Sequence, residues 1–344
     1  MKDLKILITA AGSPGSAANI KHLKQVDERK LILIGTDLNH DKIGKHWCDK
    51  FYTVPKGNDD NFIPRLVEII KKENPDVLLP QSSAEVIPIS KNKELLEKEG
   101  VKVLISSPDS VYKSENKAEL YKTLKGSDVK IPRFRIVNSL DSFLQAVSDL
   151  GYPNSPVCFK PPISKGTRGF RILRDDVSRV HALLNERPVN RFMSISEFKN
   201  IFENEKSFPE LIVMEFVKGE EHTTDPLSID GKTLLCPVKT RENERAGLAM
   251  KFVQKENQKL VDSTKYVIEK LGLDWISNLQ FIGDYLIEVN PRISTQIFSP
   301  GVNVPYLAIK FILGEITEKE VKEFSELVKT EYTALRYYDQ INYS

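Results

Sequence analysis

The chain has 344 residues, 40% of them hydrophobic and 28% charged, and its 50 Lys and Arg residues nearly balance 48 Asp and Glu residues. A formal net charge of +2 gives no bulk electrostatic basis for binding nucleic acid or a membrane surface. No apolar run approaches the roughly 20 residues that a membrane-spanning helix needs, and the length predicts two or three domains.

The cysteines indicate the cellular compartment. Cys48, Cys158 and Cys236 are odd in number and far apart, so they form neither a disulfide framework nor a zinc pattern. The first residues run almost directly into a β-like segment, without the apolar stretch and cleavage site of a signal peptide. We therefore expect a protein of the reducing cytoplasm, without nucleic-acid or membrane partners.

The first third of the chain alternates strand and helix patterns. Strands are predicted at Lys5–Ala10, Leu31–Thr36, Val77–Pro80 and Val101–Ile105, and helices at Ala17–Gln25, Asn61–Lys72 and Lys91–Glu99. Alternation with short connections is typical of a parallel sheet covered by helices on both faces. Residues 1–112 are thus predicted to form an α/β, Rossmann-like domain.

The pattern changes near Tyr112 to one with more strands and fewer helices. Helices are predicted at Ser114–Lys125, Asp141–Leu150 and Gln258–Leu271, and strands at Arg133–Val137, Val157–Lys160, Phe170–Leu173, Leu211–Val217, Thr233–Val238, Leu248–Val253, Leu279–Ile282 and Tyr285–Val289. Residues 332–343 could form a last strand. This texture indicates antiparallel α+β structure, which we divide into residues 113–215 and 216–344.

A first glycine-containing turn, with Gly12 and Gly15, lies between the first strand and the first helix. Such a turn can present backbone N–H groups to phosphate, and Asp37 ends the second strand where a ribose-binding acid lies in dinucleotide folds. These residues allow an NAD(P)-dependent oxidoreductase. The pattern is one glycine short of the dinucleotide fingerprint, so an ordinary tight turn is the alternative.

A second glycine-containing segment, Gly166-Thr167-Arg168-Gly169, joins two predicted strands, and Lys160 precedes it on the first of them. A hairpin tip of this kind can fold its backbone N–H groups over a polyphosphate while the lysine supplies a fixed positive charge. An ordinary surface hairpin is the alternative.

The most informative motif is Glu288-Val289-Asn290-Pro291-Arg292 at the end of a predicted strand. Side chains alternate along a strand, so Glu288 and Asn290 project from one face, and their oxygens suit Mg²⁺. Gln280 on the neighbouring predicted strand can add another oxygen, and Arg292 can hold a phosphoryl oxygen. The alternative is a solvated ion pair between Glu288 and Arg292.

Four motifs together resemble a known family. Lys117 on a helix, Lys160 before the glycine hairpin, Met214–Val217 with Glu220-Glu221, and Glu288-x-Asn290-Pro291-Arg292 occur in the order seen in ATP-grasp enzymes. The chain is most similar to the carbamoyl-phosphate synthase large-subunit type. The resemblance covers nearly the whole chain and implies a Rossmann-like pre-ATP-grasp domain followed by a two-part ATP-grasp domain.

The resemblance also implies roles for individual residues. ATP would be bound by Lys117 and Lys160, by the loop Gly166, Thr167, Arg168 and Gly169, by the hinge Glu215, Phe216 and Val217, and by Glu221. Gln280, Glu288 and Asn290 would hold two Mg²⁺ ions, for which Mn²⁺ could substitute. Arg292 would face the transferring phosphoryl group, so Arg292 and Lys160 are the expected catalytic residues.

The implied reaction is ligation. A carboxylate attacks the γ-phosphate of ATP, which gives an acyl-phosphate and ADP, and an amine, ammonia or a thiol then displaces phosphate. Amino-acid-like substrates and a homodimer are expected, and Ser83, Glu85 and Asp225 are candidate substrate contacts. A non-catalytic ATP-binding sensor or scaffold and the NAD(P)-dependent oxidoreductase are the alternatives.

Overall fold

The computed structural model describes the chain except residues 14, 165–167, 177, 186–190, 246–247, 294–298, 338 and 344. Its contacts divide the chain into two units. The first unit contains Met1–Glu115, Glu220–Asp284 and Glu288–Ser344, and the second contains Asn116–Gly219 and Tyr285–Ile287.

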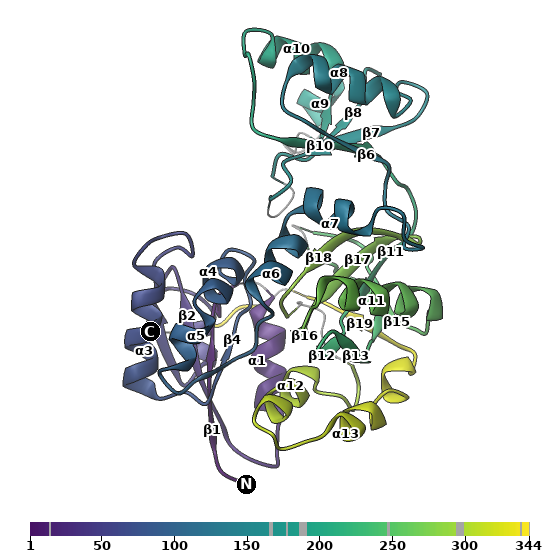
Figure 1. The fold of residues 1–344 in the computed structure, drawn as a ribbon. Helices are drawn as coiled ribbons and strands as arrows, with labels where there is room; N and C mark the ends of the chain where they lie inside the picture. The colour runs from purple at the N-terminus through teal and green to yellow at the C-terminus, as the bar shows by residue number, and fades with distance from the viewer. Residues whose placement is uncertain are drawn as a thin grey trace. The chain divides into compact units, whose positions relative to one another are not determined.

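The first unit begins with a five-stranded parallel sheet in the order β3-β2-β1-β4-β5 (Figure 1). The strands are β1 (Leu4–Ile8), β2 (Leu31–Asp37), β3 (Lys50–Thr53), β4 (Val77–Leu79) and β5 (Lys102–Val103), and the helices are α1 (Ser16–Lys24), α2 (Gly44–Trp47), α3 (Phe62–Glu73), α4 (Val86–Lys91), α5 (Lys93–Glu97) and α6 (Pro108–Glu115). Alternate strand residues serve the two faces: Ile6 and Ile8 share a buried cluster with α1, whereas Leu7 packs with α3.

The rest of the first unit holds two antiparallel sheets. A six-stranded sheet has the order β18-β17-β11-β14-β15-β19, and a three-stranded sheet has the order β13-β12-β16. The strands are β11 (Glu221–Thr224), β12 (Leu227–Ile229), β13 (Lys232–Leu235), β14 (Val238–Thr240), β15 (Lys251–Gln254), β16 (Trp275–Ile276), β17 (Asn278–Ile282), β18 (Tyr285–Asn290) and β19 (Tyr332–Leu335). The helices are α11 (Gln258–Leu271), α12 (Val304–Ile312), α13 (Glu318–Glu323) and the 3₁₀ turn η1 (Leu327–Lys329).

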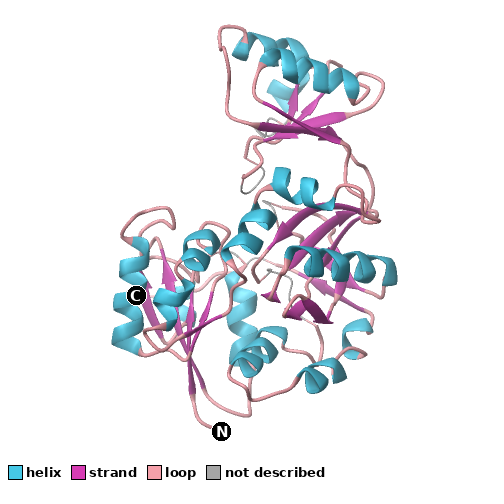
Figure 2. Cartoon of the chain, in the orientation of Figure 1, coloured by secondary structure: helices cyan, strands magenta, loops and turns pink. Residues whose placement is uncertain are grey.

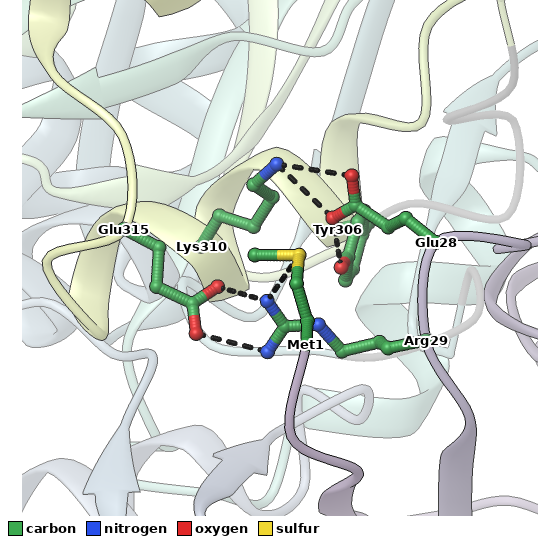
Figure 3. A network of polar contacts seen from close by, with 6 residues as sticks. All are labelled: Met1, Glu28, Arg29, Tyr306, Lys310 and Glu315. Carbon is green, nitrogen blue, oxygen red and sulfur yellow. Dashed lines mark hydrogen bonds and ion pairs between the residues drawn. The ribbon is translucent and has the colours of Figure 1, made fainter.

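Helix α12 packs on α1 and belongs to the same buried cluster as residues of the amino-terminal sheet. Tyr306, Leu307 and Ile309 belong to the same buried cluster as Ile20 and Leu23 of α1. A polar network borders this contact (Figure 3): Arg29 donates to both carboxylate oxygens of Glu315 at 2.9 and 2.6 Å, and Tyr306 donates to Glu28. The amino-terminal sheet and the carboxyl-terminal helix are therefore one structural body.

The second unit has a five-stranded sheet in the order β6-β10-β7-β8-β9, along which helices lie (Figure 2). Its elements are α7 (Lys117–Leu124), β6 (Phe134–Val137), α8 (Leu140–Asp149), β7 (Val157–Lys160), β8 (Arg171–Leu173), α9 (Arg179–Asn185), β9 (Phe192–Met193), α10 (Ile195–Phe202) and β10 (Leu211–Glu215). Stacked rings of Phe143 and Phe198, 3.6 Å apart, centre its core. The core thus joins α8 and α10 to the sheet.

The predicted fold class is confirmed, with a parallel amino-terminal sheet followed by α+β structure. Several predicted elements were wrong in extent. The helix at Ser114–Lys125 is two helices, because Asn116 is extended and caps α7 with its side chain. The strand at Thr233–Val238 is split between β13 and β14, with Pro237 between them. The helix at Lys91–Glu99 is the shorter α5, because Lys91 already ends α4, and the last strand, predicted at 332–343, ends at Leu335. The predicted three-part division of the chain stays a prediction.

Candidate functional site

Two distant segments of the first unit meet at the carboxyl end of β4. Ser83 follows this strand, and its hydroxyl oxygen accepts a hydrogen bond from Nε of Arg292 at 2.9 Å. Nη2 of Arg292 donates to Oδ1 of Asn290 at 3.1 Å, and Nη1 donates to the carbonyl of Ile293 at 3.1 Å. The guanidinium is thus oriented on three sides, so its position at the strand end is fixed.

Three carboxylates lie near the guanidinium of Arg292. Burial lowers the pKa of its guanidinium, whereas the carboxylates of Glu115, Glu288 and Asp225 act in the opposite direction. An oriented cation beside a carboxylate and an amide oxygen can bind a phosphoryl group through its outward face.

A row of polar side chains crosses the six-stranded sheet. Register pairs Gln280 with Thr223, Thr223 with Lys239, Lys239 with Gln254, and Gln254 with Tyr332. Residues directly opposite each other in antiparallel strands have side chains on the same face. Thr223, Lys239 and Gln254 are fully buried, so this face of the sheet is polar and covered.

Asn278 lies at the centre of this polar face. Its amide nitrogen donates to Oδ1 of Asp225 at 2.9 Å and to the hydroxyl of Thr223. Its carbonyl oxygen accepts from Nε2 of Gln280 and from Nδ2 of Asn290, each at 3.4 Å. Two of the three predicted metal ligands therefore share one hydrogen-bond partner.

The remaining predicted residues of the first unit lie on the same sheet. Glu288 is a half-buried residue of β18 that precedes Asn290 by two positions. Glu221 is the first residue of β11; its side chain is 42% exposed and lies 3.5 Å from Nε of Arg241. Both carboxylates can thus be reached by a ligand.

Two predicted substrate contacts are buried. Glu85 accepts a hydrogen bond from the hydroxyl of Thr9 at 2.6 Å within the amino-terminal sheet. Asp225 is fully buried and lies 3.5 Å from Nζ of Lys239, so it touches protein on all sides. Ser83 is half-buried at the strand end, and its described contacts are Arg292 and Asn290. Of the three, only Ser83 has an exposed surface that a substrate could touch.

The predicted phosphate-binding lysines lie in the second unit. Lys117 is the first residue of α7 and its backbone N–H donates to the carbonyl of Pro162 at 3.1 Å, while Lys160 ends β7. Both lysines are buried. Gly166 and Thr167 lie outside the described residues. Arg168 is exposed, and Gly169 has a φ of 74° that favours glycine, at a place where a Cβ would collide with Pro161.

The predicted hinge follows β10. The carboxylate of Glu215 forms an ion pair with Nε of Arg133 at 2.9 Å, and the backbone N–H of Phe216 donates to the carbonyl of Pro156 at 2.9 Å. Val217 follows outside the strand. The side chain of Glu215 thus serves the fold, and a nucleotide base would have to be read by the backbone of this segment.

The first glycine turn is filled by its own neighbours. The backbone N–H of Gly12 donates to Oδ2 of Asp37 at 3.0 Å, and a Cβ at Gly12 would lie 2.4 Å from Cβ of Lys42. Asp37 thus closes the turn by itself. This geometry supports the tight-turn interpretation and gives the oxidoreductase alternative no support.

Sequence reasoning missed Asn278 and Lys239. Neither belongs to a local motif, and each acquires its partners through pairing of strands that are distant in the chain. The alternation of Asn278 with Gln280 on one strand was the available signal, since both amides must then face the same side.

The donor set fits a hard cation. Glu288 offers a carboxylate, and Gln280 and Asn290 offer amide oxygens, which are the oxygen ligands that Mg²⁺ accepts. Asn278 binds the amide nitrogens of Gln280 and Asn290, so their oxygens point elsewhere. In the described part of the chain no group of three His, Cys, Asp or Glu side chains could hold a metal ion, and no helix is long and apolar enough to cross a membrane.

Comparison with known proteins agrees with this geometry. Residues 6–104 match the family model "PylC-like, N-terminal domain", and residues 207–334 match "ATP-grasp in the biosynthetic pathway with Ter operon". The carbamoyl phosphate synthase large chain of Clostridium perfringens is 26% identical over 286 residues, 78% of this chain and 24% of that protein. The amino-terminal section of the Aquifex aeolicus large chain is 26% identical over 362 residues, 93% of this chain and 60% of that protein.

The fold has solved counterparts. The biotin carboxylase domain of Hydrogenobacter thermophilus 2-oxoglutarate carboxylase, in complex with MgADP, ADP and bicarbonate, superposes with a TM-score of 0.66 at 16% identity, covering 92% of this chain and 71% of that one. The chain spans about a quarter of the length of most of the curated large chains that it matches. These matches identify a PylC-like amino-terminal domain in residues 6–104 and an ATP-grasp domain in residues 207–334.

Proposed function

We propose that the chain is an ATP- and Mg²⁺-dependent ligase that joins a carboxylate to an amine. The carboxylate attacks the γ-phosphorus of ATP and ADP leaves, which gives an acyl-phosphate; the amine then attacks the acyl carbon and phosphate leaves. Phosphoryl transfer needs positioning and charge neutralisation more than covalent help. The observation that carries the proposal is the grouping of Arg292 with Asn290, Gln280 and Asn278, a site of oxygens and one oriented cation.

Four groups of residues would each bind a different part of ATP. Lys117 and Lys160 would neutralise phosphate charge, and Gly166, Thr167, Arg168 and Gly169 would supply backbone N–H groups to phosphate oxygens. The backbone of Glu215, Phe216 and Val217 would read adenine, and Glu221 would bind the ribose hydroxyls. The 42% exposure of the Glu221 side chain supports this last role.

Gln280, Glu288 and Asn290 would hold two Mg²⁺ ions, and Mn²⁺ could replace them. When bound, the ions would offset the negative charge of the triphosphate. The residues themselves fix where that charge can lie, because Asn278 restrains both amides and Arg292 lies beside Asn290.

Arg292 and Lys160 would be the catalytic residues, since both would contact the transferring phosphoryl group. Ser83 would hold Arg292 and border the carboxylate substrate. Glu85 and Asp225, which the sequence assigned to substrate, would act indirectly, because both are buried against protein. The substrates would be small and amino-acid-like.

The proposal also includes a cellular compartment and an oligomeric state. Cys48, Cys158 and Cys236 are free thiols, and burial raises the pKa of each to about 12, which suits a reducing cytoplasm. A homodimer is proposed because the carboxylase domain of Hydrogenobacter thermophilus is described as a dimer. No nucleic-acid or membrane partner is proposed.

The test is product analysis. The protein is incubated with ATP, Mg²⁺ and pools of amino acids, and nucleotides and phosphate are quantified. We expect substrate-dependent release of ADP and phosphate, because acyl-phosphate formation breaks the bond to the γ-phosphorus. Stoichiometric AMP and pyrophosphate would refute the mechanism. Binding of ATP without substrate-dependent turnover would favour the sensor or scaffold alternative.

A further inference from the structure

A buried ion pair lies within the polar face, next to Asn278. Oδ2 of Asp225 and Nζ of Lys239 are 3.5 Å apart, both side chains have an exposed fraction of 0%, and the ammonium also lies over the ring of Phe252. Burying two charges is unfavourable, and well-packed apolar residues are often at least as stable in such positions. The pair is therefore poorly explained by stability alone.

The chemistry of the pair determines how Asn278 is oriented. An ionised carboxylate only accepts hydrogen bonds, so Asp225 can bind only the amide nitrogen of Asn278, as it does at 2.9 Å. The carbonyl oxygen of Asn278 must then face the opposite side. The ammonium of Lys239, 3.5 Å from Oδ2 of Asp225, is the counter-charge of this carboxylate.

The orientation of Asn278 is passed to two further amides. Its carbonyl oxygen accepts from the nitrogens of Gln280 and Asn290, and an amide whose nitrogen is held presents its oxygen in another direction. Arg292, which can only donate, independently holds the oxygen of Asn290. Both ends of the chain of bonds thus require the same orientation.

Resting on the function proposed above, we propose that Asp225 and Lys239 are positioning residues that, through Asn278, fix the amide orientation of Gln280 and Asn290. The oxygen of Gln280 is thereby preset for the divalent cations that accompany the nucleotide, and the oxygen of Asn290 is kept on the side of Arg292. Partners that orient metal ligands typically change metal affinity 10- to 100-fold when they are removed. The ion pair is in this interpretation part of the metal site, although it touches no ligand.

The decisive variant replaces both charges together. In Asp225→Leu/Lys239→Met no buried charge is left unpaired, so the fold should remain stable, but Asn278 loses the restraint that Asp225 places on its amide nitrogen. We expect Mn²⁺ to bind the ADP-saturated protein 10- to 100-fold more weakly, measured by electron paramagnetic resonance of free Mn²⁺. The affinity for ADP without metal should change less than twofold, and the urea midpoint should not fall.

A second variant tests whether the orientation of the amides, and not the charge pair itself, determines the affinity for Mn²⁺. In Asp225→Asn/Asn278→Asp the carboxylate moves to position 278, where it accepts from Gln280, Asn290 and the new amide at position 225. The orientation of both ligand amides is then preserved, so Mn²⁺ affinity should stay within about threefold of wild type, a small change beside the typical loss. The single variant Asn278→Leu should lose the wild-type affinity for Mn²⁺.

The matched control lies in the same sheet. Thr224 and Thr264 form a buried hydroxyl pair, 2.9 Å apart, and the side chain of Thr224 lies on the opposite face from that of Thr223. Thr264→Val should lower the urea midpoint without changing Mn²⁺ affinity. Wild-type Mn²⁺ affinity in Asp225→Leu/Lys239→Met would overturn the positioning role. Failure of the wild-type protein to bind Mn²⁺ with ADP would instead overturn the proposed function, and the positioning role with it.

Discussion

The hydroxyl of Ser83 accepts a hydrogen bond from Nε of Arg292 at 2.9 Å, although the two residues are 209 positions apart. Ser83 belongs to the loop after β4 of the parallel amino-terminal sheet, and Arg292 follows β18 of the six-stranded antiparallel sheet. The amino-terminal domain thus takes part directly in the site that the antiparallel sheet carries.

Ser83→Ala tests this contact. The guanidinium of Arg292 would keep its bonds to Asn290 and Ile293 but lose its restraint at Nε. We expect kcat for ADP release to fall about 10-fold with little change in KM for ATP, because the lost positioning affects phosphoryl transfer more than nucleotide binding. Ser82→Ala is the control, since Oγ of Ser82 accepts from the N–H of the neighbouring Ala84. Equal rates in both variants would contradict the role of Ser83.

Glu288→Gln tests the proposed metal site. The change keeps the shape of the side chain but removes the one negative charge among the three proposed ligands, so Mg²⁺-dependent turnover should fall more than about 100-fold. The urea midpoint should stay near that of wild type. The control is Glu269→Gln on the exposed side of α11, which should retain full activity. Unaltered Mg²⁺ dependence in Glu288→Gln would refute the assignment.

Much of the fold follows from local patterns. The strand Val157–Lys160 and the helix Gln258–Leu271 have the predicted bounds, because one is a short apolar run and the other ends at Gly272 with a φ of 61°. Helix α12 was missed. Its apolar run with Pro305 in the first turn hides helical periodicity, because the helix is buried against both α1 and β16.

The sequence predicted the site residues only where they lie on a single segment of the chain. Alternation along a single strand placed Glu288 and Asn290 at a strand end beside Arg292. The roles of Asn278 and Lys239 depend instead on which strands are neighbours, and Lys239 acquires Asp225 only because β14 pairs with β11. Asp225 was predicted as a substrate contact from its position after the hinge; full burial of its side chain was not visible in the sequence.

His22 should make the stability of the protein depend on pH. Burial, assisted by the charge of Lys239, lowers the pKa of its imidazole to about 4 from an ordinary 6.5. The unfolded chain therefore binds a proton first as pH falls, so stability should decrease between pH 6.5 and about 4 and then stop changing on this account. Because His22 is only partly buried, we expect a loss of about 1–2 kcal/mol.

His22→Gln should flatten this part of the pH profile. Urea unfolding at pH 7.5, 6, 5 and 4 measures it, and the difference between variant and wild type should grow as the pH falls. His40→Gln is the matched control, because the side chain of His40 is 58% exposed. If both variants follow the wild-type profile, the burial of His22 has no energetic consequence.

The ion pair between Arg29 and Glu315 should stabilise the contact of α12 with the amino-terminal sheet. The Arg29 side chain is 1% exposed and donates to both carboxylate oxygens, whereas Glu315 is 26% exposed (Figure 3). In Glu315→Gln the buried guanidinium loses its counter-charge, so we expect a loss of about 2 kcal/mol in the free energy of unfolding.

Glu318→Gln is the control, because its pair with Lys322 is exposed and should contribute less than about 0.5 kcal/mol. The double variant Arg29→Met/Glu315→Leu removes both charges and should be more stable than Glu315→Gln, since no charge is then left unpaired in the core. The urea midpoints of the three variants, each compared with wild type, test this prediction. A double variant less stable than Glu315→Gln would mean that packing of the Arg29 side chain on the ring of Tyr306, rather than its charge pair, holds the contact.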